Sequence, residues 1–216
     1  MSRLRPAFCC AAAVVFLCGW AAAQSPAATA DPATLTFTFD FPGNTPPHYT
    51  LQIAADGNGT YTAEESAEQY RVGFHLSQSA MAPWLAQARA MHFFSGNYQS
   101  PRKVAFTGTK TVAYAGPDGR GATTFVYTED PEMARLTGEL QQVALTLQTG
   151  QTLESHLKHQ RMALDADLDD YQQALKDHMA SHPEAITSAL QELVESPEAM
   201  TRVSRKARAI LSSVQP

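Results

Sequence analysis

The sequence predicts an α+β protein, in which an antiparallel sheet with packed helices is followed by an all-helical C-terminal extension. Three observations carry this prediction. Apolar and polar residues alternate in several segments before residue 128, as in half-buried strands. Two Asp-Gly-x-Gly turns, which suit hairpins, begin at Asp56 and Asp118. After Gly150 the apolar residues recur three or four apart, which indicates helices alone.

The first half contains the clearest strand patterns. Residues 34–41 alternate Thr or Asp with Leu or Phe, residues 49–53 repeat the alternation, and the turn at Asp56 leads into a returning strand at 60–62. Residues 70–76 alternate again. Ser77 or Ser79 can then cap a helix, and Pro83 requires that this helix begin near residues 80–82.

The second half of this region repeats the pattern of the first half over fewer residues. It has strand patterns around Val104 and Phe106, at 112–114 and at 125–127, with the second Asp-Gly-x-Gly turn between the last two. Asp130 as N-cap and Pro131 in the first turn predict a helix with a stripe of Leu136, Leu140, Val143 and Leu147. The repetition indicates either an internal duplication or an independent reuse of the same turn chemistry.

The tail reads as three helices. An amphipathic helix of about 28 residues carries leucines from Leu153 onward and Met179 at its end, and it is separate from the preceding helix or continuous with it through Gly150. A short helix follows at 186–194, and a last one begins at Ser196 as N-cap. The stripes pack on each other and on the sheet, or they provide an interface for a protein partner or for self-association.

The N-terminus reads as an export signal. Residues 1–23 contain Arg3 and Arg5, an apolar stretch and Ala21-Ala22-Ala23, which predict cleavage before Gln24. The alternatives are an uncleaved membrane anchor and a lipoprotein acylated on Cys18. A flexible leader at 24–33, an α+β domain at 34–148 and the helical extension at 149–216 complete the expected organisation.

The composition limits the cellular compartments and the classes of binding partner that are expected for this protein. All three cysteines, Cys9, Cys10 and Cys18, fall inside the signal, so the mature chain is expected to be cysteine-free, as is common in the bacterial periplasm. The formal net charge of −5 argues against non-specific nucleic-acid binding. No later segment is apolar for long enough to span a membrane.

Candidate metal ligands are two histidine pairs at helical spacing, His156 with His159 and His178 with His182. Only Glu154 and Glu184 lie nearby in the sequence as further donors, so a solvated helix face is favoured over a metal site. Asp165, Asp167, Asp169 and Asp170 resemble the opening of a calcium loop, but the sixth place is Asp170 and the twelfth is Lys176, so a solvated acidic face is favoured.

Catalytic motifs are lacking in the sequence. There is no Gly-x-Ser-x-Gly, and a triad would have to assemble in space from His48, His75 or His92. A basic cluster of Arg202, Arg205, Lys206 and Arg208 complements the dipole of the last helix, or it meets an acidic partner or a lipid headgroup. We therefore assign no catalytic, cofactor-binding or metal-binding residue and expect no cofactor.

The strand at 35–39, the segment 106–111 and the strand at 124–128 before a helix, together with the export signal, resemble a family of uncharacterised exported bacterial proteins. The resemblance implies export and α+β character only. We expect an exported periplasmic or cell-envelope protein that acts as a non-catalytic binding or interaction module. The alternatives are an envelope-directed hydrolase with a spatially assembled His/carboxylate site and a chaperone-like helper that uses its long helices.

The first prediction concerns processing. Intact-mass measurement of the protein recovered from its native cell envelope is expected to give a chain that starts at Gln24, because the three alanines before it suit the signal peptidase. A chain that retains Met1, or one acylated on Cys18, would contradict the predicted cleavage.

Overall fold

The computed structural model describes residues 32–65 and 68–214. The predicted signal peptide, the cleavage site before Gln24, nearly all of the leader and the three cysteines lie outside the described residues.

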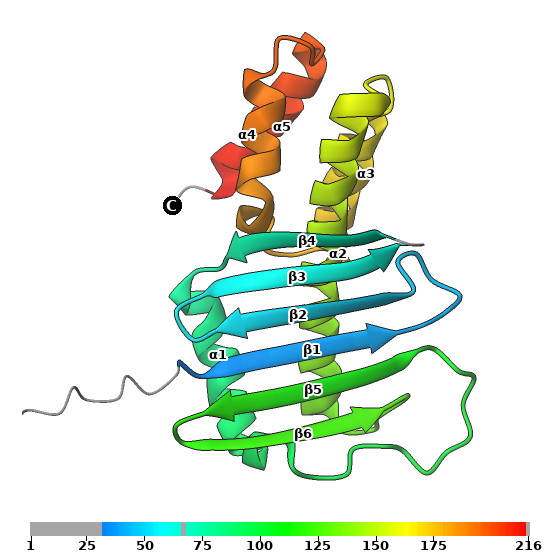
Figure 1. Ribbon diagram of the computed structural model, residues 1–216, viewed down its shortest axis with the longest axis vertical. Helices are drawn as coiled ribbons and strands as arrows, with labels where there is room; N and C mark the ends of the chain where they lie inside the picture. Colours follow the sequence, from blue (N-terminus) through cyan, green and yellow to red (C-terminus); the bar gives the residue numbers. More distant parts are fainter. Residues whose placement is uncertain (1–31, 66–67, 215–216) are drawn as a thin grey trace, which may run out of the picture. The chain divides into compact units, whose positions relative to one another are not determined.

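The sheet has six strands, and every neighbouring pair is antiparallel. The strands are β1 (Thr34–Asp40), β2 (His48–Ala54), β3 (Asn58–Glu65), β4 (Glu68–His75), β5 (Thr109–Gly116) and β6 (Gly119–Phe125). Their order is β4-β3-β2-β1-β5-β6, so the first four form a meander and the β5–β6 hairpin is added beside β1 (Figure 1). The predicted fold class, an antiparallel sheet with packed helices and a helical C-terminal region, is confirmed.

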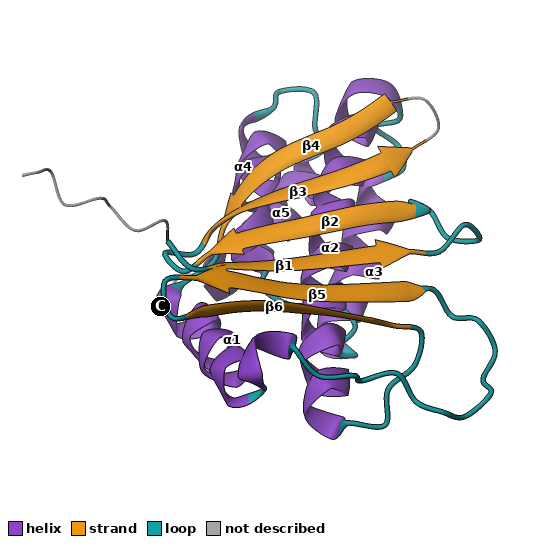
Figure 2. Cartoon of the chain, turned by 60° about the horizontal axis from the view of Figure 1, so that its bottom comes forward, coloured by secondary structure: helices purple, strands orange, loops and turns teal. Residues whose placement is uncertain are grey.

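The two faces of the sheet differ in composition. One face carries the alternate apolar residues, among them Phe37, Leu51 and Tyr61, and all three are fully buried. The helices α1 (Gln78–Ala90) and α2 (Pro131–His159) lie against this face (Figures 1 and 2). The opposite face is rich in threonine, and the strand register places one threonine from each of five strands side by side: Thr62, Thr50, Thr38, Thr111 and Thr124.

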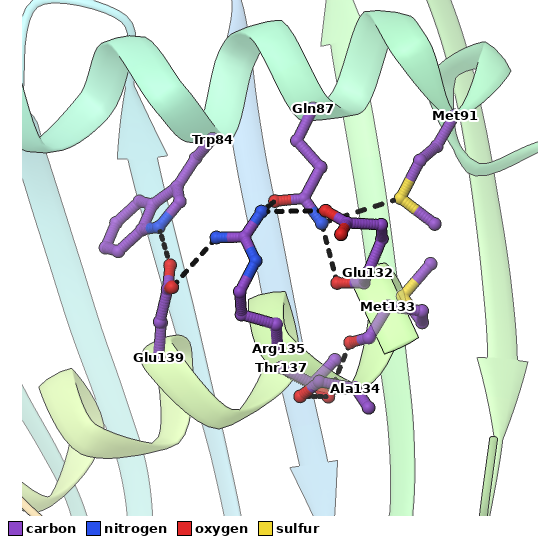
Figure 3. A network of polar contacts seen from close by, with 9 residues as sticks. All are labelled: Trp84, Gln87, Met91, Glu132, Met133, Ala134, Arg135, Thr137 and Glu139. Atoms are coloured by element: carbon purple, nitrogen blue, oxygen red, sulfur yellow. Dashed lines mark hydrogen bonds and ion pairs between the residues drawn. The ribbon is translucent and has the colours of Figure 1, made fainter. Parts of the chain in front are cut away.

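A polar network joins α1 to α2 (Figure 3). The Trp84 indole donates to Glu139 at 2.6 Å, and the Arg135 guanidinium donates to Glu139, to Glu132 and to the Gln87 side chain at 2.9 Å each. Gln87 in turn donates to the Glu132 carbonyl oxygen at 2.6 Å. These bonds hold α1 against α2. Gln87 is buried, so moving the two helices apart would leave its amide without partners, and this would destabilise the fold.

Both predicted N-caps of the sheet-packing helices are present. The Ser77 side chain accepts from the Ala80 amide at the start of α1, and the Asp130 side chain accepts from the Met133 amide at 2.9 Å at the start of α2. Pro83 lies within the first two turns of α1, which begins somewhat earlier than predicted.

A left-handed turn follows α1. Three consecutive residues of the short helix η1 (His92–Phe94) have φ of 51°, 55° and 63°, a conformation that costs non-glycine residues about 1–2 kcal/mol each. Packing compensates this cost, because Phe94 is fully buried and Phe93 stacks on Tyr114 with 5.2 Å between ring centroids. The turn also needs Gly121, where a Cβ would lie 2.3 Å from the Phe93 carbonyl oxygen.

The predicted strand around Val104 and Phe106 is wrong. Residues 101–108 form a loop, and these two side chains are 44% and 54% exposed. Two alternating residues bury too little apolar surface here to hold a strand, and β5 already occupies the position beside β1. The second half therefore lacks counterparts of the first and last strands of the first half. The need for Gly121 beside η1 gives the second Asp-Gly-x-Gly turn a local reason of its own.

The predicted helix of about 28 residues is also wrong. The helix α2 runs through Gly150 to His159, the chain turns at 160–163, and α3 (Leu164–Lys176) runs separately. Gly150 is accommodated because Ile186 packs onto it, where a Cβ would lie 2.6 Å from an Ile186 methyl group. The expected domain boundary near residue 148 therefore falls inside one continuous helix.

The tail continues with η2 (Pro183–Ile186), α4 (Thr187–Glu195) and α5 (Thr201–Val214). Its apolar stripes are buried among these helices and against α2: Leu153, Leu157, Leu164, Leu168, Leu190, Leu193, Val203 and Ile210. Met179, expected in the stripe, is 62% exposed. The last helix begins later than predicted, and the Ser196 hydroxyl accepts from the Glu198 amide in the preceding turn. No helix in the described part of the chain is long and apolar enough to cross a membrane.

The second prediction tests the left-handed turn. Gly121→Ala is expected to lower the free energy of unfolding by about 1–3 kcal/mol, because its methyl group would press on backbone atoms of η1. Gly138→Ala is the matched control: its Cβ meets nothing within 4 Å, and removing a glycine from a helix interior stabilises by about 0.5–1 kcal/mol. Urea unfolding of both variants measures the difference. Equal stability of the two would contradict the close packing at η1.

Candidate ligand groove

Two adjoining hollows lie along α2, beside the loop that joins β1 to β2. Their volumes are about 540 and 520 Å³, and both are lined by Leu145 and Gln148. We call the first the aromatic hollow, the second the polar hollow, and the two together the α2 groove. The aromatic hollow is lined by Phe39, Phe41, Asn44, Tyr49, Thr107, Gly138, Gln141, Gln142, Leu145, Gln148, His178 and Met179. The polar hollow is lined by Thr45, Pro46, Leu145, Gln148, Thr149, Gln151, Thr152, Ser155, His156, Asp167, Asp170, Tyr171 and Ala174.

The aromatic hollow is built on the ends of β1 and β2. Phe39 and Tyr49 are almost fully buried and pack with 5.4 Å between ring centroids, while Phe41 is half-buried. Burial raises the pKa of Tyr49 far above its usual value, although a hydrogen bond with Gln141 opposes the shift. The Gln142 side chain donates to the His178 carbonyl oxygen at 2.8 Å and so holds the loop after α3 beside α2. This hollow is therefore lined by aromatic rings at the ends of β1 and β2 and by side-chain amides of α2.

Exposed apolar side chains border the aromatic hollow. Met179 lines it and is 62% exposed. Phe106 is 54% exposed and meets Phe41 edge to face, with 5.8 Å between ring centroids. Large apolar residues left open beside a hollow are typical of a binding surface.

The polar hollow contains a histidine–carboxylate pair. His156, near the end of α2, contacts the Asp167 carboxylate of α3 through Nδ1 at 2.6 Å. The contact orients the imidazole and bridges the two helices. Below it, Tyr171 is 2% exposed and donates to the Thr146 hydroxyl at 3.4 Å, and burial raises the pKa of the Tyr171 phenol.

Several lining side chains have unused hydrogen-bonding capacity. Gln148, Thr152 and Ser155 follow one side of α2, and Asp170 faces the same hollow from α3. None of these four side chains makes a hydrogen bond or ion pair within residues 32–65 and 68–214. The groove therefore offers donors and acceptors to a ligand.

The members of each predicted histidine pair have different surroundings or conformations from those expected on one helix face. His156 contacts Asp167, whereas His159 is exposed. His178 and His182 lie in the loop between α3 and η2, both with φ of 56°, rather than on one helix face. Among the described residues, no three His, Cys, Asp or Glu side chains are grouped to hold a metal ion.

The three histidines considered for a triad also lie apart. His48 on β2 contacts Asp40, and His75 at the end of β4 contacts Asn58 at 3.1 Å, toward the opposite end of the sheet. His92 belongs to the left-handed turn. The structure brings none of them together. His156, in contrast, contacts a carboxylate, and both partners of this contact line the polar hollow.

The acidic run is not simply a solvated face. Asp165 contacts Arg202 at 3.1 Å and Lys206 at 2.8 Å, and Asp169 contacts Lys206 at 2.6 Å. Half of the predicted basic cluster is thus paired within the chain, between α3 and α5. The contact with Lys206 is the main reason why the pKa of Asp165 lies below its usual value. Asp167 and Asp170 point the other way and line the polar hollow.

Sequence reasoning missed the groove, although one signal was present. Gln148, Thr152 and Ser155 are spaced by four and three residues, which places them on one side of a helix. Their opposing residues come from the β1–β2 loop and from α3, and helical spacing does not report such neighbours. Comparison of the chain with protein-family models and with curated proteins found no match.

The third prediction concerns the Asp165 contacts. Because the folded-state pKa of Asp165 is lowered, its stabilising contribution is present above the unfolded value near 4 and is lost as the pH falls through the folded value. Asp165→Asn is expected to lower the urea midpoint at pH 7 and to lower it by less at pH 3, where part of the contribution is already lost. Asp170→Asn, which removes an exposed carboxylate without an ion pair in the described structure, is the control. An Asp165→Asn effect that is equal at both pH values would contradict the assignment.

Proposed function

We propose that the protein is exported to the periplasm or cell envelope and acts there as a non-catalytic binding module, with its ligand in the α2 groove. One observation carries the proposal: two adjoining hollows on α2 combine exposed apolar side chains with polar groups that have no partner within the described residues. Each volume lies within the range of about 300–1,000 Å³ that is usual for small-molecule sites. Export rests on the predicted signal peptide.

The groove supports binding better than hydrolysis. A hydrolase of the expected kind needs a nucleophile within hydrogen-bond reach of its base. His156 contacts a carboxylate, but the Ser155 hydroxyl makes no hydrogen bond to it among the described contacts. The chaperone-like alternative has less support as well, because the apolar stripes of the tail helices are buried inside the protein. Because the stripes are buried, they expose little apolar surface through which two copies of the protein could associate.

The fourth prediction uses Gly138 to block the groove. Gly138 lines the aromatic hollow from α2, and a Cβ there meets nothing within 4 Å, so a large side chain can enter the hollow without disturbing the core. Gly138→Trp is expected to abolish retention of native envelope material on the immobilised protein, while wild type and Gly138→Ala retain it. Retained protein and sugar are quantified by mass spectrometry.

Unchanged circular dichroism and urea midpoints no lower than that of wild type establish that both variants are folded. Equal retention by all three forms, or retention by none, would contradict the proposal that the groove holds the ligand.

A further inference from the structure

We infer that the ligand of the α2 groove is a neutral oligosaccharide, an inference that rests on the proposed function. The juxtaposition that carries it is a row of uncharged amide and hydroxyl groups on α2 that faces a carboxylate on α3 and continues into a hollow rimmed by aromatic rings.

The charges of the groove exclude an anionic ligand. Neither hollow is lined by Lys or Arg among the described residues, whereas Asp167 and Asp170 both line the polar hollow. The Lys110 ammonium lies 5.6 Å from the centroid of the Phe39 ring, but Lys110 lines neither hollow. Phosphate and carboxylate ligands are normally held by Arg or Lys, and here they would meet like charge instead.

The unused polar groups match the chemistry of a sugar. Gln148, Thr152 and Ser155 carry groups that both donate and accept hydrogen bonds, as sugar hydroxyls do, and the Asp170 carboxylate accepts. The first and last of the three α2 residues are seven residues apart, which is about 10 Å along a helix axis. That length suits a chain of sugar rings rather than one ring.

The aromatic hollow provides the apolar contact that the carbon faces of sugar rings need. Phe41 is half-buried and the Phe106 ring beside it is 54% exposed, so both present ring surface at the rim. An apolar peptide is the competing ligand, since Met179 and Phe106 would also contact its side chains. The sugar is favoured because the side chains of an apolar peptide would leave the hydrogen-bonding groups of Gln148, Thr152 and Asp170 without partners in the polar hollow.

The test is calorimetric titration of the signal-free chain with three kinds of probe. The neutral probes are β-1,4-glucan, α-1,4-glucan and N-acetylglucosamine tetrasaccharides, the acidic probe is a tetragalacturonate, and the third is an apolar, uncharged decapeptide. We expect at least one neutral tetrasaccharide to bind, with the tetragalacturonate at least tenfold weaker.

Gln148→Leu and Thr152→Val keep side-chain size but remove hydrogen bonds, and each is expected to weaken the neutral sugar at least tenfold. Gln191→Leu is the matched control on exposed α4 surface outside both hollows, and it is expected to leave the affinity unchanged.

Binding of the decapeptide with no neutral sugar bound, or equal affinity for acidic and neutral sugars, would overturn the inference. A failure of all neutral sugars while Gly138→Trp still abolishes retention of envelope material would reject the sugar and leave the binding function standing. If no neutral sugar binds and Gly138→Trp also fails to abolish retention of envelope material, the proposed function itself is rejected.

Discussion

The burial of the apolar face of the sheet against α2 is the contact on which the remaining structure depends. Met133, Leu136, Leu140 and Val143 are fully buried along this helix, and burial of each such side chain stabilises the fold by about 1.5–3 kcal/mol. The polar network around Arg135 then holds α1 on α2, and Leu153 continues the same helix into the tail core. One uninterrupted helix therefore connects the sheet, α1 and the C-terminal helices.

This arrangement also explains why the groove lies where it does. The side of α2 that faces the sheet is apolar, so Gln148, Thr152 and Ser155 lie on a different side, where the β1–β2 loop and α3 approach. A site built on a helix that belongs to the core is held rigidly by that core. Helix α2 thus provides the fixed side of the groove. The opposing lining includes Thr45 and Pro46 of the β1–β2 loop and the segment around Met179.

The charged residues of α3 show how one sequence pattern can divide into two roles. Asp165 and Asp169 join α3 to α5 through Lys206, whereas Asp167 meets His156 on the side of α2. Neighbouring positions on a helix point in different directions, so a run of acids contacts different elements. The same run therefore stabilises the tail and lines a candidate site.

The sequence by itself determined the features that depend on neighbours in the chain. Alternation identified β1 to β4 and indicated the β5–β6 hairpin, although β6 ends at Phe125 and Tyr127 lies beyond it. The Ser77 and Asp130 caps were predicted because capping is local. Only the tertiary structure decided that residues 101–108 form a loop, that the helix breaks at 160–163, and that η1 turns left-handed against Gly121. The groove belongs to this second group, since its lining comes from segments far apart in the sequence, and the pattern along one helix does not encode what packs beside it.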